Sequence, residues 1–225
     1  METLYTKFVS CVFCNYFCSM NEEFKNILEK IYKLFQKYGI KSVTMDDIAK
    51  ELGISKKTLY LHVKDKKELV QKIAELKITY AEKHNKEIYE KKLNAIDELL
   101  HVYKFLNVML KDHNPSMMFD LRKYYPEIYE RMQEARRNQI FNGIKNNLVK
   151  GRKEEFYRKD FDDEIISKLH VFRIENLVDS NLFNSSDFES GKLFRELFTY
   201  HIRGIASEKG IKYFEKKSKE FNLLT

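Results

Sequence analysis

The sequence predicts an all-α protein with a small N-terminal domain and a larger helical C-terminal domain. Apolar residues recur at intervals of three and four along most of the chain, and no segment shows the alternation typical of a strand. Only seven glycines and two prolines occur in 225 residues, which favours long helices over many turns. The hydrophobic fraction of 43% and the charged fraction of 33% are those of a soluble globular protein.

The first 19 residues hold all three cysteines of the chain, Cys11, Cys14 and Cys18. Three interpretations compete for this segment. A metal site would need a fourth ligand, which is not nearby, and a secretory signal would need a longer apolar run and a small-residue cleavage site. We favour the third interpretation, in which Met20 is the natural start and residues 1–19 are a non-native or disordered extension. The rest of the chain has no cysteine, in agreement with a reducing cytoplasm.

A first amphipathic helix is predicted from Glu22 to Tyr38. Its apolar residues recur at threes and fours, and Gly39 follows as the residue best suited to end it. Ile40 and Val43 would pack beneath this helix. The helix would supply one wall of a small three-helix domain.

The segment 44–67 has the pattern of a helix-turn-helix. Thr44 is a good N-cap, and Asp47 three residues later can return a hydrogen bond to the free amides. Gly53 can take the left-handed conformation that ends the first helix, and Ser55 can cap the second. The first helix of the motif should therefore begin near Met45.

The second helix of this motif should present a polar, cationic face. Leu59 and Val63 return to the apolar side, and between Gly53 and Lys67 five lysines face a single acidic residue. Such a face suits the phosphates of a nucleic acid, because lysines displace their counterions and hydroxyls bind their oxygens. The net charge of +7 agrees with an anionic partner. A solvated lysine face would give the same composition. It would not need the N-caps, the Gly53 turn and an apolar Ile54 between the two helices at this spacing.

The segment 27–74 resembles the DNA-binding domain of the tetracycline-repressor (TetR) family of bacterial transcription regulators. The resemblance is carried by the nearly uninterrupted order of Tyr-Gly, Thr, Ile-Ala, Leu-Gly-Ile-Ser, Thr-Leu-Tyr, His and Lys-x-Lys. It implies a cytoplasmic, homodimeric repressor that binds a palindromic operator in double-stranded DNA. It also implies an unknown small-molecule effector that releases the protein from that operator.

The resemblance assigns roles to single residues of the motif. Thr44 would bind a phosphate, and Tyr60, His62 and Lys66 would hold the DNA backbone. Leu61 departs from the aromatic residue often found in the family, but an apolar side chain there can contact a thymine methyl. The residues facing the major groove would be Lys56, Lys57, Thr58 and Leu61.

Beyond the motif the chain reads as further helices. Asp65 can cap a helix that continues to about residue 90, and Gly151 should end the long charged helix that starts at Pro126. We therefore expect a DNA-binding domain over residues 20–66 and an effector-binding and dimerisation domain over residues 67–225. The other expected helices are 95–111, 161–183 and 191–207, with 208–225 either a short helix or a loose tail.

In the resembled family the C-terminal domain dimerises and encloses a ligand. The dimer helices would be the last two long ones, 162–183 and 191–207, arranged as a four-helix bundle with the partner's. His101 and His113 are further possible polar contacts of the ligand. Ordinary core packing would explain the same side chains. The candidate ligand-binding residues are Phe105, Met109, Met117, Met118, Phe119, Tyr124, Tyr125, His170 and Arg173.

The sequence gives no sign of an enzyme, a cofactor or a membrane span. No phosphate loop, nucleophile elbow, zinc helix or paired Cys-x-x-Cys occurs after the N-terminal segment, and no stretch is long and apolar enough for a bilayer. His170 and His201 could meet to bind a metal, but their spacing is not local. Two other functions stay open: a ligand-independent nucleoid or cell-division factor of the same fold, and an exported helical interaction protein.

Overall fold

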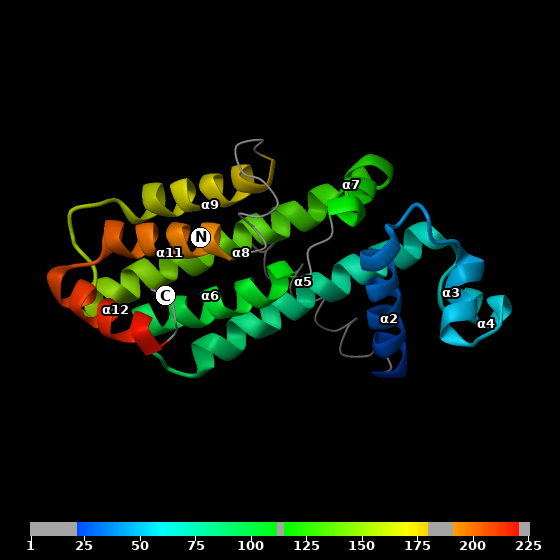
Figure 1. Ribbon diagram of the computed structural model, residues 1–225, viewed down its shortest axis with the longest axis horizontal. Helices are drawn as coiled ribbons and strands as arrows, with labels where there is room; N and C mark the ends of the chain where they lie inside the picture. Colours follow the sequence, from blue (N-terminus) through cyan, green and yellow to red (C-terminus); the bar gives the residue numbers. More distant parts are fainter. Residues whose placement is uncertain (1–21, 112–114, 180–190, 221–225) are drawn as a thin grey trace, which may run out of the picture. The chain divides into compact units, whose positions relative to one another are not determined.

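A computed structural model describes residues 22–111, 115–179 and 191–220, with the side chains of 107–111 and 177–179 excepted. The expectations for residues 1–19 lie outside this part. Its named elements are all α-helices, and its one isolated bridge joins Tyr157 to Ala206 (Figure 1). The all-α prediction is therefore confirmed.

The described chain forms two compact units. Of the described residues, unit 1 takes those up to Lys83 and 115–135, and unit 2 takes 84–111 and those from Arg136 onward. Two long helices, α5 (Lys66–Glu90) and α8 (Pro126–Lys153), begin in unit 1 and end in unit 2. The functional boundary near residue 66 stays a prediction.

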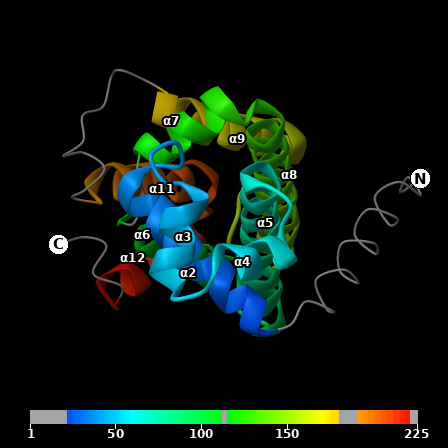
Figure 2. The same cartoon turned by 90° about the vertical axis from the view of Figure 1, so that its right-hand side faces the viewer.

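Unit 1 is built on the three helices of the predicted motif. They are α2 (Glu22–Tyr38), α3 (Met45–Leu52) and α4 (Lys56–His62), and α3 packs against both α2 and α4 (Figure 2). A further helix, α7 (Pro115–Tyr124), packs on α2. The fully buried side chains of this core include Leu28, Ile31, Phe35, Ile48, Leu59 and Leu69.

Unit 2 contains α6 (Ala95–Lys111), α9 (Asp163–Asp179), α11 (Lys192–Ile205) and α12 (Glu208–Glu220), with the ends of α5 and α8. The expectation that 208–225 includes a helix is thus confirmed for α12. Residues 180–183 of the expected dimer helix lie outside the described part. The core of unit 2 includes Ile96, Leu100, Leu148, Tyr157, Ile202 and Phe214.

A buried polar network ties α6 to α8 in unit 2. Glu98 is 3% exposed, and its two oxygens accept from Lys150 at 2.6 Å and from Asn147 at 3.1 Å. The hydroxyl of Tyr157 donates to Asn147 at 2.8 Å. Because every side chain of this network has a hydrogen-bond partner, the network orders the core without the free-energy cost of a buried, unpaired polar group.

Gly151 does not end its helix, so that prediction was wrong. The residue lies inside α8, which continues to Lys153. A Cβ on Gly151 would lie 2.1 Å from Cδ2 of Tyr157. Gly151 is therefore explained by close packing of an aromatic ring on the helix backbone, which the local sequence does not show.

Candidate DNA-binding surface

Local hydrogen bonds build the helix-turn-helix as predicted. The Asp47 amide donates to the Thr44 hydroxyl at 3.1 Å, and the Thr44 amide donates to the Asp47 carboxylate at 2.8 Å. This is a complete capping box for α3. Gly53 has a φ of +67°, in the left-handed region, and the Thr58 amide donates to the Ser55 hydroxyl at 3.0 Å. The turn between α3 and α4 is thus fixed by its own residues.

The orientation of α4 follows from two buried anchors. Leu59 and Val63 are buried in the unit 1 core, as predicted. The opposite side of the helix is open, because Tyr60 is 42% exposed and Leu61 is 76% exposed. Lys56 and Lys57 are exposed on the same side. The anchors therefore leave a cationic and hydroxyl-bearing face toward solvent.

Two acidic residues in the first turn of α3 each accept hydrogen bonds from a neighbour. Asp46 accepts a 2.7 Å ion pair from Lys56, and this hydrogen bond raises the pKa of Lys56 above its ordinary value. Hydrogen bonds from the hydroxyl and amide of Thr44 lower the pKa of Asp47. Lys56 thereby joins α4 to α3 across the turn.

His62 and Lys66, both predicted to hold the DNA backbone, have additional partners. The His62 ring stacks on Phe24 of α2, with 4.8 Å between ring centroids. The Lys66 ammonium donates to the carbonyl of Ile40 at 2.6 Å and to that of Val43. Its burial lowers the pKa of Lys66. This geometry favours a role for Lys66 in holding the loop before Thr44.

The predicted ligand-binding residues divide between the two units. Met117 is buried in the unit 1 core, and Met118 and Tyr125 pack against that core. Phe119 and Tyr124 are exposed on the same unit. In unit 2, Phe105 stacks on His84 at 3.7 Å, whereas the side chains of Met109 and His113 lie outside the described part. The described members of the set are therefore divided between unit 1 and unit 2.

His170, Arg173 and His201 meet between α9 and α11 in unit 2. The Nδ1 atoms of the two histidines lie 3.4 Å apart, and Nη2 of Arg173 lies 3.1 Å from Nδ1 of His170. Burial lowers the pKa of His170 to about 3 and that of His201 well below its ordinary value. Both rings are therefore neutral near pH 7. Among the described residues, no group of three or more His, Cys, Asp or Glu is placed to hold a metal.

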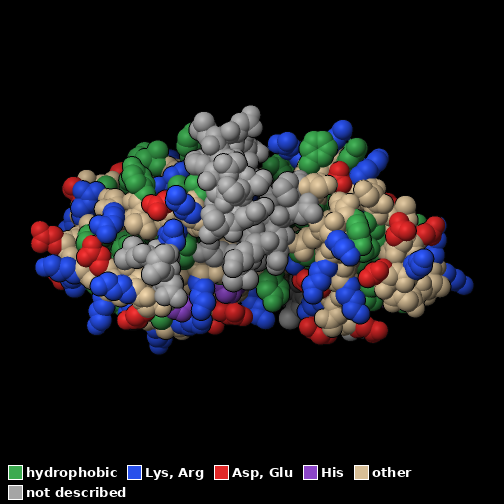
Figure 3. Space-filling view, in the orientation of Figure 1, with side chains coloured by type: hydrophobic (Ala, Val, Ile, Leu, Met, Phe, Trp, Pro, Cys, Tyr) green, Lys and Arg blue, Asp and Glu red, His purple; other side chains and the backbone are tan. Residues whose placement is uncertain are grey.

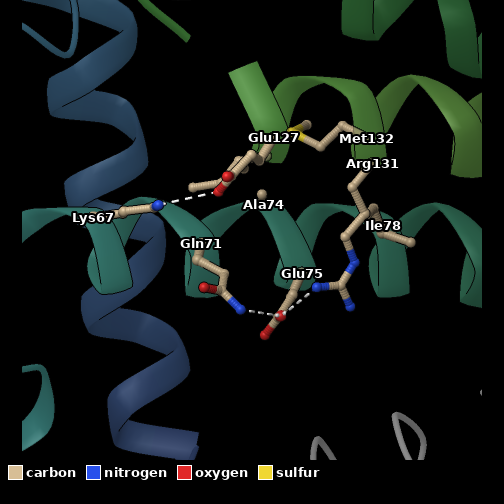
Figure 4. Close-up of a pocket in the computed structure, with 9 residues that line it drawn as sticks. Lys67, Gln71, Ala74, Glu75, Ile78, Glu127, Arg131 and Met132 are labelled. Carbon is tan, nitrogen blue, oxygen red and sulfur yellow. Dashed lines mark hydrogen bonds and ion pairs between the residues drawn. The ribbon is translucent and has the colours of Figure 1, made fainter. Parts of the chain in front are cut away.

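Each of the two units has a hollow among its described residues. A groove of about 220 Å³ in unit 1 lies between the N-terminal parts of α5 and α8, with ion pairs at Lys67–Glu127 and Glu75–Arg131 (Figure 4). A second hollow of about 280 Å³ in unit 2 is lined by Tyr89, Glu98, Asn146 and Lys150. None of the helices over residues 22–111, 115–179 and 191–220 combines the length and apolar character of a membrane span.

Comparisons with known proteins agree with this geometry. Residues 27–73 match the family model of bacterial regulatory proteins of the tetR family. A helix-turn-helix transcriptional regulator of Bacillus subtilis, YvaF, is 22% identical over 82% of this chain and 96% of its own length. A transcriptional regulator from Cytophaga hutchinsonii superposes with a TM-score of 0.66 at 18% identity, covering 83% of this chain and all of that one. A γ-butyrolactone receptor superposes with a TM-score of 0.60 at 15% identity, over 88% and 95% of the two chains.

The capped motif and the matched family model define the class of this protein as a helix-turn-helix DNA-binding protein. More narrowly, residues 27–73 have the sequence pattern of the tetR family of bacterial regulatory proteins, and the relatives that match the chain are helix-turn-helix transcriptional regulators. The resemblance noted from the sequence is confirmed.

Proposed function

We propose that this regulator is a cytoplasmic homodimeric repressor that binds a palindromic operator and is released by a small-molecule effector. The observation that carries the proposal is α4, which two buried anchors and a capped turn hold with its cationic face open. In helix-turn-helix proteins of this kind the second helix enters the major groove. The two copies of α4 in a dimer would enter successive grooves, roughly 34–36 Å apart.

Each predicted DNA-binding residue of the motif has a role in this proposal. Lys57, Thr58 and Leu61 face base edges. Lys56 lies beside them and keeps its ion pair with Asp46. Thr44, Tyr60 and His62 contact phosphates. Lys66 contributes mainly through the carbonyls that its ammonium binds.

DNA binding by purified protein tests these roles. Tyr60→Ala should weaken binding to the chain's own upstream intergenic DNA and to unrelated DNA alike, whereas Lys57→Ala should alter sequence preference. Lys212→Ala, which removes an exposed lysine of unit 2, is the matched control for net charge. Equal binding to all sequences by the unaltered protein would favour the nucleoid-factor alternative.

The proposed dimer surface lies on α9 and α11. Ile165, Leu169 and Phe172 recur at helical spacing on α9 and are 53%, 56% and 65% exposed, and Tyr200 of α11 is 74% exposed. Hydrophobic side chains gather over α9 in Figure 3. A stripe of large apolar side chains is costly in water, so a second copy covering it supports the dimer. The spacing of the α9 residues was visible in the sequence, although their exposure was not.

The oligomeric state tests this surface. Leu169→Asp and Phe172→Asp should convert a dimer to a monomer in sedimentation experiments, because a buried unpaired carboxylate is strongly unfavourable. Tyr80→Asp introduces the same charge at an exposed aromatic of α5 and should leave the dimer intact. A dimer that survives both α9 substitutions would place the interface elsewhere.

The effector part of the proposal rests on the family and on unit 2. The superposed γ-butyrolactone receptor is, by its name, a small-molecule receptor. Here α5 and α8 both run from unit 1 into unit 2, and the ion pairs of Figure 4 join their N-terminal parts. A ligand that prefers another arrangement of these helices would shift the population away from DNA by its differential affinity. Addition of such a ligand should release DNA from the intact dimer.

A further inference from the structure

The loop between α2 and α3 leads directly into Thr44 and is held from the α5 side. Gly39 begins it with a φ of +80°, and its amide closes α2 on the Phe35 carbonyl at 2.9 Å. The Lys66 ammonium then binds the carbonyls of Ile40 and Val43. The backbone that presents the α3 N-cap is thus fastened at two carbonyls.

A second element, α7, holds the same loop from another direction. Oδ2 of Asp120 accepts the backbone amide of Lys41 at 2.8 Å. The Lys41 ammonium lies over the Tyr124 ring, 4.5 Å from its centroid. A Cβ on Gly39 would lie 2.9 Å from Oδ2 of Asp120, so the glycine permits this close approach. Gly39 and Lys41 of the loop therefore pack against Asp120 and Tyr124 of α7.

Asp120 is an unusual residue for this position, because it is 8% exposed within an apolar core. A buried carboxylate is costly unless hydrogen bonds and opposite charge compensate it. The Lys41 amide supplies a hydrogen bond, and the charge of Asp120 acts to raise the pKa of Lys66, against the larger lowering effect of burial. Apolar packing of α7 alone would not require a carboxylate here.

We propose that Asp120 is a positioning residue for DNA binding. By holding Lys41 it fixes the loop 39–43, and through this loop it sets the position of Thr44 and the first turn of α3. The inference rests on the proposed contact of Thr44 with a phosphate. Tight DNA binding then requires that α7 contacts the loop 39–43 through Asp120.

The direction in which DNA affinity changes when Asp120 is replaced distinguishes a positioning role from a purely electrostatic effect of its charge. Removing a negative charge from a DNA-binding protein should leave affinity equal or increase it. Asp120→Ala should instead weaken binding to the upstream intergenic DNA by about tenfold, the effect of losing one charge-assisted hydrogen bond. Asp120→Asn, which keeps an oxygen acceptor, should fall between. Glu130→Gln removes an exposed negative charge of the same unit and is the matched control.

Thr44→Ala then tests whether Asp120 acts through the loop. In a double-mutant cycle the loss from Asp120→Ala should shrink in the Thr44→Ala background, because both changes remove the same contact. Additive losses would overturn a role through Thr44. Affinity that rises in Asp120→Ala as it does in Glu130→Gln would overturn the positioning role altogether.

Amide exchange supplies a readout that needs no DNA. In Asp120→Ala the Lys41 amide should lose protection, and in Asp120→Asn it should lose less, while the Gly39 amide, bonded to Phe35, should keep its protection in both. Unchanged protection of Lys41 would show that Asp120 does not hold the loop. If unaltered protein fails to bind DNA, the proposed function fails and the positioning role with it, whereas the exchange result still reports the contact itself.

Discussion

The helices of the helix-turn-helix and those at the junction of α8 with α12 in unit 2 are positioned by different kinds of contact. The ends of α3 and α4 are set by residues within a few positions, such as Thr44, Gly53 and Ser55. The junction of α8 with α12 instead depends on contacts distant in sequence, including the Phe156 carbonyl, which accepts from the Ser207 amide at 2.9 Å. Because its caps are local, the first region can be predicted from the sequence, and changing any one cap should cost little stability. Close backbone approach makes the second sensitive to a single methyl group.

The largest expected effect comes from Gly210 in α12. A Cβ there would lie 2.1 Å from the Phe156 carbonyl oxygen, which is backbone and cannot rotate away. Gly210→Ala should lower the free energy of unfolding by about 3 kcal/mol, the upper part of the range for overpacking. Urea unfolding followed by circular dichroism measures this change.

Gly204 provides the matched control for that substitution. It lies in α11, and a Cβ there meets nothing within 4 Å. Gly204→Ala should therefore raise the free energy of unfolding by about 0.5–1 kcal/mol, because alanine is the better helix former. Equal effects of the two alanines would mean that α12 does not pack on the Phe156 carbonyl.

The same contrast explains what the sequence could predict. The caps at Thr44 and Ser55, the left-handed Gly53 and the burial of Leu59 all follow from patterns of three or four residues, and all are confirmed. The prediction that Gly151 ends a helix was wrong, because a glycine is needed there to leave room for the ring of Tyr157. Exposure on α9 and the hold of Lys66 on the preceding loop likewise depend on tertiary packing. Periodicity reveals which residues are apolar, but not which of them a neighbour covers.

Acid should destabilise unit 2 through the histidines between α9 and α11. The pKa of His170 is about 3 in the folded protein, and Arg173 and His201 beside it add no negative charge. Glu175 of α9 is already paired with Arg137 at 2.8 Å. An unfolded histidine binds a proton near pH 6.5, so the folded state is at its most stable above that pH.

As the pH falls from about 6.5 toward 3, His170 should remove about 1.4 kcal/mol per pH unit from the free energy of unfolding. Between pH 6.5 and pH 5 this amounts to about 2 kcal/mol for His170. Urea unfolding at a series of pH values should show a shallower acid slope for His170→Gln than for the unaltered protein. Identical slopes would mean that His170 is protonated in the folded state.

The smallest effect should come from the turn between α3 and α4, where the strain is confined to one residue. Gly53 has a φ of +67°, and a Cβ there would meet nothing within 4 Å. Gly53→Ala should therefore lower the free energy of unfolding by about 1 kcal/mol, the cost of a left-handed alanine, with no packing loss added. Gly53→Asn should cost less, since asparagine tolerates this conformation.

The same pair of variants separates local strain from a displaced recognition helix. If the turn only stores strain, both Gly53 variants should bind the upstream intergenic DNA as tightly as the unaltered protein, because Leu59 and Val63 still anchor α4 in the core. A loss of affinity in Gly53→Ala with full affinity in Gly53→Asn would show that the alanine changes the turn and moves α4. That result would make the turn, together with the buried anchors, a determinant of how α4 enters the groove.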